Sequence, residues 1–458
     1  MFYFLFILVS IFALYAFWFG ITVLREKVFR PGILGLLTFL GMAAALAIYA
    51  WAHRAGYLSN PVAQVIQIVV AVLIVLFTVA MFIPIGRNPK ALEGTRGMIE
   101  GEPEKFNQKD TAFNVAHVGG YGPDVGKKRW ALQSQDIFGG IYWTLVMGLR
   151  NQVEGKVNPV KQREGISPEE VTKEIKRMAK YAGADMVGVT TVKQDFTYSE
   201  AFSYEESKLE TGPAVTSPIE LKHKYAIVMA KEMDYEAVNT TLTNKNERNL
   251  AEVGKAYYEV AQVAVALASY IRALGYPARA HHLRNEQIFH VPHAVDAGLG
   301  EQGRLNYLIT PEYGPRVRLA SVTTELELVE DKPIDIGVQD FCMNCRLCEI
   351  NCPSHAIEAE KAVVRGYRKW PQYQEKCFSF WVSGANTFAC TLCLKICPWN
   401  KPRLLVHNIS FFVATRSKLA RRVLYYMSIL FYGKRIRVER VPHKGEVEMP
   451  PETKNWGK

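Results

Sequence analysis

Cysteine is absent from most of this 458-residue chain. All eight cysteines lie between Cys342 and Cys397, and none occurs before or after that stretch. Disulfides that hold a fold together would be spread over it, so this distribution excludes a disulfide scaffold. Any cysteine-ligated metal is therefore confined to one short segment.

Charged side chains are absent from three long apolar segments, roughly residues 2–24, 32–52 and 61–86. Each has the ~20 apolar residues that a helix needs to span a bilayer. The first lacks a basic start and is too long for the apolar core of a signal peptide, and no twin-arginine pair lies near the N-terminus. The sequence therefore predicts a three-helix membrane anchor over residues 1–86, multi-pass in the cytoplasmic membrane.

Loop charges predict the orientation of this anchor. Basic residues favour the cytoplasmic side. The loop after the first segment has Arg25, Lys27 and Arg30, whereas the loop after the second has only Arg54. The stretch after the third segment is again basic, with Arg87, Lys90 and Arg96. This asymmetry places the N-terminus outside and the large C-terminal portion in the cytoplasm. The net charge of +11 includes a basic run near the C-terminus, where ten Lys and Arg between residues 401 and 440 face one Glu. With an anchor on the same chain, membrane lipid is a better partner for this run than nucleic acid, and a solvated basic face is the simpler alternative.

The cysteines form two runs with related spacing. The first reads Cys342-x2-Cys345-x2-Cys348-x3-Cys352-Pro353, and the second reads Cys377-x12-Cys390-x2-Cys393-x3-Cys397-Pro398. Two-residue gaps let one loop bring three thiolates to a cubane, and the fourth cysteine, followed by proline, ligates the other cluster. The pattern predicts two 4Fe–4S clusters, one held by Cys342, Cys345, Cys348 and Cys397 and the other by Cys377, Cys390, Cys393 and Cys352. Zinc would use separated CxxC pairs without the third cysteine, and is the weaker alternative.

Between the anchor and the cysteines, the sequence predicts an α+β protein. Residues 87–165 are predicted to connect the anchor to a catalytic domain over 166–335, followed by a ferredoxin-like two-cluster domain over 336–405 and a basic segment over 406–458. Ser167-Pro168-Glu169-Glu170 caps a helix that runs to about Tyr181. A long amphipathic helix is predicted over 247–274, with strands over 184–192, 225–233, 305–310 and 316–328, which together indicate a sheet covered by helices.

Two further motifs have weaker interpretations. Gly298-x-Gly300-x2-Gly303 matches a dinucleotide fingerprint by letter, but it precedes a predicted strand where the fingerprint should follow one. A turn that lets backbone approach another large cofactor is the better interpretation. A group of four histidines has no accompanying cysteine and no HExxH pattern, so hydrogen-bonded or surface histidines are favoured over a metal site; its members are His281, His282, His290 and His293.

Residues 167–433 resemble the corrinoid-dependent reductive dehalogenases. The resemblance rests on the two cysteine runs and on five shorter motifs: Tyr270-Ile-Arg-Ala-Leu-Gly-Tyr276, Val291-Pro292, Ala297-Gly-Leu-Gly-Glu-Gln-Gly-Arg304, Leu308-Ile-Thr310 and Gly314-Pro-Arg-Val-Arg318. It implies a nitroreductase-like core that binds a cobalamin-type corrinoid base-off and receives electrons through two 4Fe–4S clusters. No histidine here lies in an Asp-x-His-x2-Gly loop, which agrees with base-off binding. The three apolar segments differ from the family's respiratory members, which usually carry a twin-arginine signal.

The resemblance also implies roles for individual residues. The catalytic proton donor falls on Tyr257, its basic partner on Arg318, and the substrate-pocket asparagine on Asn285. We expect the corrinoid near a stretch that contains Gly298, Gly300, Gly303 and Arg304.

The implied reaction removes halide from an organohalide. The implied partners are that substrate, membrane lipid and an electron donor such as a quinol, a ferredoxin or a flavoprotein; a homodimer is an option. Two alternatives remain at this point. An epoxyqueuosine reductase would use the same cofactors on a modified tRNA base, and a membrane electron carrier would only relay electrons. A membrane anchor and a tyrosine near the start of the long helix disfavour the first.

Overall fold

A computed structural model describes residues 2–25, 29–83, 88–122, 124–134, 137–243, 245–384 and 387–435. The chain divides into two compact units, Met1–Arg87 with Arg403–Lys434, and Asn88–Pro402 with Arg435–Lys458. The α-helices are α1 Phe2–Arg25, α2 Phe29–Arg54, α3 Pro61–Phe82, α4 Ala112–His117, α5 Val125–Ser134, α6 Ile137–Leu149, α7 Pro168–Tyr181, α8 Tyr235–Val238, α9 Asn246–Ala273, α10 His290–Asp296, α11 Val338–Cys345, α12 Leu347–Ile350, α13 Gln374–Trp381, α14 Leu392–Lys395, α15 Leu405–Ala414 and α16 Lys418–Tyr432. The strands are β1 Met186–Thr191, β2 Glu200–Phe202, β3 Thr216–Pro218, β4 Tyr225–Glu232, β5 Ala278–His281, β6 Glu301–Gln302, β7 Leu308–Ile309, β8 Val317–Thr324, β9 Ala362–Val364 and β10 Tyr367–Lys369.

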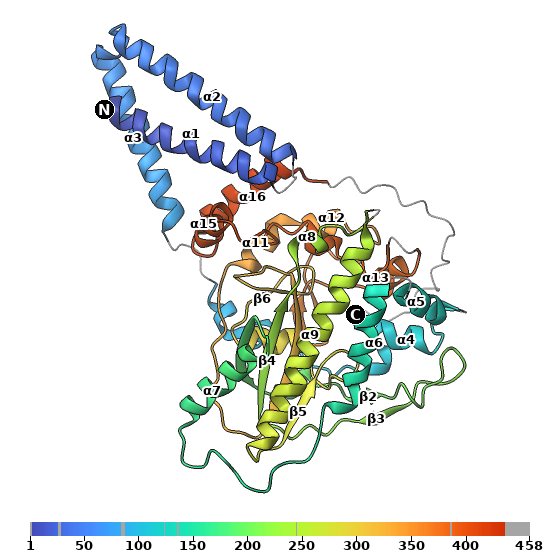
Figure 1. Cartoon of the computed structure of the whole chain (residues 1–458). Helices are drawn as coiled ribbons and strands as arrows, with labels where there is room; N and C mark the ends of the chain where they lie inside the picture. The colour runs from blue at the N-terminus through green and yellow to red at the C-terminus, as the bar shows by residue number, and fades with distance from the viewer. Residues whose placement is uncertain are drawn as a thin grey trace. The chain divides into compact units, whose positions relative to one another are not determined.

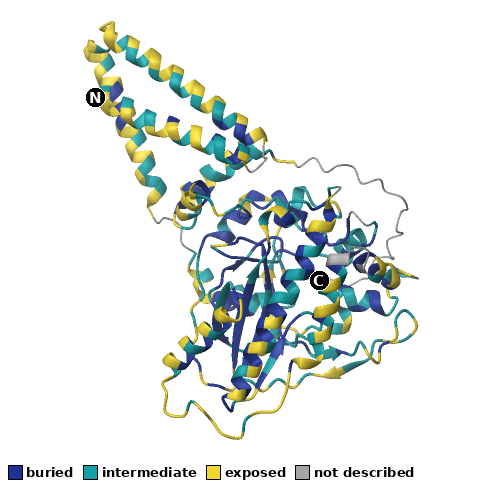
Figure 2. Ribbon diagram, in the orientation of Figure 1, coloured by how far each residue is buried: buried dark blue, intermediate teal, exposed yellow. Residues whose placement is uncertain are grey.

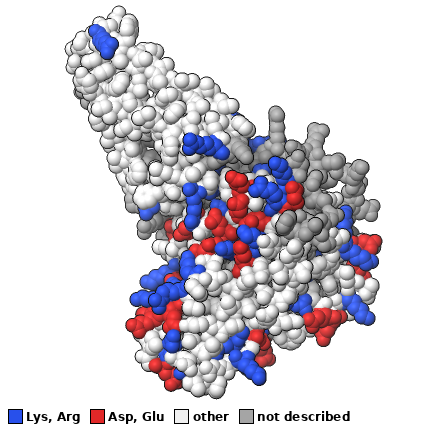
Figure 3. Space-filling model, in the orientation of Figure 1, with Lys and Arg blue, Asp and Glu red and all other residues white. Residues whose placement is uncertain are grey.

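The first unit consists of the three apolar helices α1–α3 together with α15 and α16 (Figure 1). The apolar side chains of α1–α3 are mostly exposed (Figure 2), and the visible surface of these three helices carries few charged side chains (Figure 3). α1 and α2 approach closely because glycines face each other, and a Cβ on Gly35 would lie 2.8 Å from the Cα of Gly20. All three helices are long and apolar enough to cross a membrane, as predicted.

The C-terminal part of the first unit was predicted only as a basic segment. Its described residues form α15 and α16 instead. The Ser417 hydroxyl caps α16 by accepting a hydrogen bond from the backbone N–H of Ala420, and it lies 3.3 Å from the carbonyl oxygen of Ala80 in α3. The basic residues at 437 and 440 lie outside the described residues.

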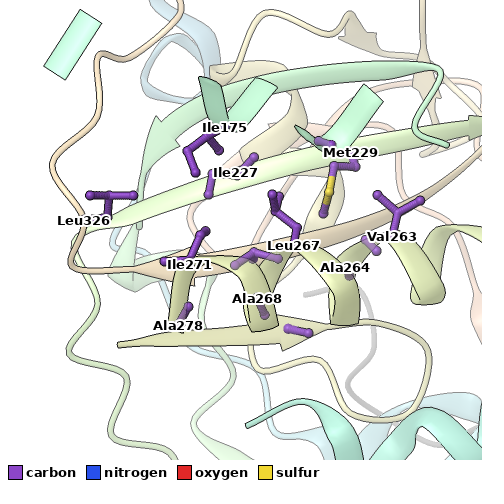
Figure 4. Close-up of a cluster of buried hydrophobic side chains, with 14 of the residues drawn as sticks. Ile175, Ile227, Met229, Val263, Ala264, Leu267, Ala268, Ile271, Ala278 and Leu326 are labelled. Atoms are coloured by element: carbon purple, nitrogen blue, oxygen red, sulfur yellow. The ribbon is translucent and has the colours of Figure 1, made fainter. Parts of the chain in front are cut away.

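The second unit is built on a four-stranded antiparallel sheet in the order β1-β4-β8-β5. α9 covers one face of this sheet, and its apolar side packs on β4 and β8 (Figures 1 and 4). Ile227 and Met229 of β4 meet Leu267 and Ile271 of α9 in this core. Burying each such side chain contributes roughly 1.5–3 kcal/mol to stability. α10 packs on the other face, where Val228 and Ala230 meet Ala294.

Several predicted elements of this unit are confirmed. Ser167 caps α7 by accepting a hydrogen bond from the backbone N–H of Glu170, and the helix ends at Tyr181. The strand predicted over 305–310 is shorter, because Asn306 has a φ of 60° and only Leu308 and Ile309 pair with β6. The predicted connecting region contains three helices, α4–α6, and α6 packs along α9.

The cysteine-bearing segment is joined to the sheet by buried contacts. The Glu301 carboxylate accepts hydrogen bonds from the backbone N–H groups of Ile336 (2.8 Å) and Val338 (3.0 Å) at the start of α11. Gly314, with a φ of 57°, passes so close that a Cβ there would lie 2.1 Å from the carbonyl oxygen of Trp399. Only glycine fits such a left-handed turn against backbone. The segment after Cys342 is therefore held in a defined position next to the start of β8.

Candidate active site

A cavity of about 410 Å³ lies where β8 lacks a neighbour on one side. β5 pairs only with residues 321–324 of β8, and the preceding residues Val317, Arg318 and Leu319 line the cavity. Much of the remaining wall is aromatic and comes from distant parts of the chain; it includes Phe106, Phe196, Tyr198, Tyr257, Phe289, Tyr307 and Tyr367. A large, mostly apolar cavity with a few polar groups is typical of a cofactor site.

Tyr257 and Arg318 meet at this cavity, as the sequence predicted for a proton donor and its cation. The guanidinium carbon of Arg318 lies 4.7 Å from the ring centre of Tyr257. Arg318 is buried, and no carboxylate forms an ion pair with it within the described ranges. Arg316, the arginine two residues earlier in the chain, is instead paired with Glu232 at 2.8 Å. Arg318 is therefore the arginine available to the tyrosine.

The neighbouring Tyr258 has a different environment. Its hydroxyl accepts a hydrogen bond of 2.8 Å from the side-chain amide of Gln262, and its ring lies 6.1 Å from that of Tyr142 in α6. Tyr258 is not among the residues that line the cavity, whereas Tyr257 is. Of these two adjacent tyrosines, only Tyr257 is therefore placed at the cavity.

Sequence reasoning missed a second tyrosine in the site. Tyr307 lines the cavity, and the guanidinium carbon of Arg318 lies 6.0 Å from its ring centre. Burial raises the pKa of Tyr307, and the neighbouring Cys393 and Cys377 act in the same direction, while Arg318 opposes them. Tyr307 therefore lies between the cavity and the second cysteine set. In the sequence, Tyr307 was marked only as part of the strand predicted over 305–310, which gives no indication that it lies in the site.

Asn285 does not line the cavity. Its side-chain oxygen accepts a hydrogen bond of 2.6 Å from Arg279, and its amide donates to the carbonyl oxygen of Arg150. The next residue, Glu286, lines the cavity instead.

Gly298, Gly300 and Gly303 do not line the cavity, although Gln302 in the same stretch does. A Cβ on Gly298 would lie 2.4 Å from the carbonyl oxygen of Lys332, and one on Gly300 would lie 2.2 Å from that of Ile309. These two glycines therefore let the chain pack against its own backbone. Arg304 donates hydrogen bonds to the carbonyl oxygens of Cys342 (2.5 Å) and Glu358 (3.1 Å), so it belongs to the cysteine region.

The eight cysteines separate into two sets in space. Cys342, Cys345, Cys348 and Cys397 line one small cavity together with Arg304. Cys352, from the first run, lies instead near Cys377, Cys390 and Cys393, whose pKa values it raises. This is the crossed grouping that the spacing predicts.

The chemistry of these thiols fits metal clusters. Burial raises the pKa of Cys342 and that of Cys390 to about 11, so both would be protonated at neutral pH without a cation beside them. Iron displaces those protons and compensates the thiolate charge. No described group of His, Cys, Asp or Glu is placed to hold a single metal ion.

The histidine group contains no metal site in the described structure. His281 and His293 are buried and hydrogen-bonded, to Thr323 at 2.8 Å and to the backbone N–H of Lys193 at 3.1 Å. Burial lowers the pKa of both, so they are neutral. His290 differs, because it lines the cavity and its Nε2 has no hydrogen-bond partner.

The site combines two sets of four cysteines with a large cavity lined by aromatic residues. Residues 341–401 match the family model described as "4Fe-4S dicluster domain". A tetrachloroethene reductive dehalogenase of Desulfitobacterium hafniense is 33% identical over 311 residues, which cover 58% of this chain and 55% of that protein. The chain thus spans about half the length of the curated relatives it matches. Epoxyqueuosine reductase of Lactococcus garvieae matches over only 119 residues, at 30% identity, covering 24% of this chain and 31% of that protein.

Solved structures agree with this similarity. A catabolic reductive dehalogenase, NpRdhA, in complex with 3-bromo-4-hydroxybenzoic acid superimposes with a TM-score of 0.64 at 26% identity, covering 75% of this chain and 50% of that one. A reductive dehalogenase described in terms of B12-dependent dehalogenation gives a TM-score of 0.65 at 25% identity, covering 75% of this chain and 50% of that one. In sequence and in fold, this chain is therefore similar to reductive dehalogenases.

Proposed function

We propose that the chain is a reductive dehalogenase, which replaces a halogen atom X of an organohalide by hydrogen. The overall reaction, R–X + 2e⁻ + H⁺ → R–H + X⁻, needs an electron source, a proton donor and a substrate cavity. The meeting of Tyr257 and Arg318 in one aromatic-lined cavity is the observation that carries the proposal. The cysteine region beside Tyr307 supports it, because electrons can reach the cavity from there.

The cavity suits a cobalamin-type corrinoid, bound base-off. Polar atoms of its lining residues are buried without a hydrogen-bond partner, among them Nε2 of His290 and Nε of Arg318. Buried polar atoms in native proteins are nearly always satisfied, so these atoms fit a bound group with polar substituents. When bound, a corrinoid would supply the cobalt chemistry that cleaves the carbon–halogen bond. Two 4Fe–4S clusters on the two cysteine sets would feed it single electrons, with Arg304 beside the first.

Tyr257 supplies the proton in this proposal, and Arg318 makes that transfer easier. Free tyrosine has a pKa of ~10, so it is a reluctant acid near neutrality. A guanidinium beside the phenol stabilises the phenolate that remains after proton transfer. Tyr257 lies on α9 and Arg318 lies on β8. Because α9 packs on the sheet that contains β8, these two side chains are held together before substrate arrives.

Three apolar helices support attachment to a membrane. We propose a multi-pass anchor in the cytoplasmic membrane, with the catalytic unit on the cytoplasmic side, as the loop charges predict. The electron donor would then be a membrane quinol or a cytoplasmic ferredoxin or flavoprotein. Membrane lipid and a second copy of the chain are further proposed partners; nucleic acid is not.

An anaerobic assay of halide release, with reduced viologen as electron donor and both aromatic and aliphatic halides, tests the function. The holoenzyme should release halide in proportion to viologen oxidised, at two electrons per halide. Purified protein that contains iron but no extractable corrinoid, and releases no halide, would identify an electron carrier instead.

A further inference from the structure

The carboxyl group of Glu286 is a polar feature of the cavity that the reaction above does not use. Glu286 lines the same cavity as Tyr257 and Arg318. Its Oε2 is buried and has no hydrogen-bond partner. Leaving such an atom unsatisfied is unfavourable, so a ligand that completes its hydrogen bonding would be favoured.

Backbone pairing fixes the position of this carboxyl group. The segment from Glu286 to Phe289 runs beside residues 196–198, where the backbone N–H of Tyr198 donates to the carbonyl oxygen of Gln287 (3.0 Å) and that of Phe289 donates to Phe196 (2.8 Å). Gln108 donates from its side chain to the carbonyl oxygen of Glu286. The group is thus on a well-connected wall rather than on a free loop.

The surroundings of Glu286 on this wall are aromatic. The rings of Tyr198 and Phe289 stack with centres 4.2 Å apart, and Phe106 lies 6.1 Å from Phe289 with its ring edge-on. Such surfaces bind a flat ring well. One carboxyl group beside them can accept a hydrogen bond from a hydroxyl on that ring, or donate one to its ionised form. A chlorinated ethene has neither a ring nor a hydrogen-bonding group.

We propose that Glu286 is a specificity-determining residue, whose carboxyl group hydrogen-bonds the hydroxyl of an aromatic organohalide, a halogenated phenol. The proposal rests on the dehalogenase function proposed above and names its substrate class. Glu286 takes the place in the cavity that the sequence match assigns to Asn285, whose side chain is bonded elsewhere.

The test measures binding and turnover separately. Calorimetric titration of the holoenzyme with a brominated phenol and with its methyl ether compares two ligands that differ in one hydrogen-bond donor. We expect the wild type to bind the phenol about 10- to 100-fold more tightly. Glu286→Leu should remove this preference and Glu286→Gln should keep part of it, because its amide can still form a hydrogen bond. Glu205→Gln, a carboxylate change outside the cavity, should keep all of it.

Halide release from the same pair of compounds distinguishes the two proposals. A wild type that binds the phenol through Glu286 but releases no halide would overturn the dehalogenase function and leave the binding site standing. Equal affinities for phenol and ether, or a preference that survives in Glu286→Leu, would overturn the role of Glu286. Loss of corrinoid from both Glu286 variants would also overturn it, since the carboxyl group would then hold the cofactor.

Discussion

Replacing Tyr257 by phenylalanine removes one oxygen and one proton from the cavity wall and keeps the ring. The ring contacts to Trp143, at 5.7 Å between centres, and to Arg318, at 4.7 Å, do not depend on the hydroxyl. Iron and corrinoid content should therefore stay near wild type. Loss of a positioned general acid typically slows a reaction by ~100- to 10,000-fold, and we expect halide release to fall within that range.

The contribution of Arg318 can be estimated from the structure. The guanidinium carbon of Arg318 lies 4.7 Å from the ring centre of Tyr257, and opposite charges at about that separation interact by about 3.5 kcal/mol at an effective dielectric constant of ~20. This corresponds to roughly 400-fold in rate. Arg318→Ala should lose up to that factor. The rate of the double variant should fall by less than the product of the two single losses, because both side chains act in the same proton transfer.

Single-turnover halide release with chemically reduced holoenzyme is the suitable assay, because it isolates chemistry from electron supply. Tyr258→Phe is the matched control and should be nearly neutral, since its hydroxyl contacts only Gln262 in the described structure. Wild-type rates in Tyr257→Phe with full cofactor content would refute the assignment. If Tyr307→Phe were then the inactive variant, the buried second tyrosine would be the donor.

Three other predictions can be checked independently. Purified protein should contain about eight iron atoms, and Cys352→Ser should perturb the electron paramagnetic resonance signal of the second-run cluster; damage confined to the first-run cluster would contradict the crossed sets. A reporter that fluoresces only in the cytoplasm, fused after Lys458, should be bright, and a dark fusion with an active export reporter would reverse the orientation. Burial raises the pKa of Glu286 to about 7, although backbone hydrogen bonds from Glu286, Arg284 and Asn285 and the charge of Arg284 oppose this shift. The folded state therefore binds this proton more tightly than the unfolded state does, so its stabilising effect is complete below pH ~4.5 and is lost as pH rises through 7. The groups that face this carboxyl are Arg284, Tyr198 and Tyr204. The apparent melting temperature of wild type should fall more steeply over that range than that of Glu286→Gln, and parallel curves would disprove it.

Local patterns in the sequence predicted much of the fold. A span of apolar residues, a capping serine or a cysteine run is encoded within a few neighbouring positions, so each can be recognised without knowing what packs on it. The predicted ends of α7 and the three apolar helices agree with the structure for this reason. β5 was not predicted, because four residues are too few to show periodicity. α4–α6 were not predicted either, since helices of this kind are stabilised by packing, as α6 is against α9.

Some residues of the site could likewise be predicted from the sequence, whereas others could be found only from the structure. The spacing of the cysteines alone predicted the composition of the two cysteine sets, and the family resemblance suggested Tyr257 and Arg318 as proton donor and cation. Only the tertiary structure decided which of two adjacent tyrosines lines the cavity and which of two arginines is free of a carboxylate partner. It also decided that Glu286 and Tyr307 enter the cavity while Asn285 and the three glycines do not. These outcomes depend on which side chains meet across α9, β8 and the loop after β5, and such contacts between distant residues leave no local pattern to read.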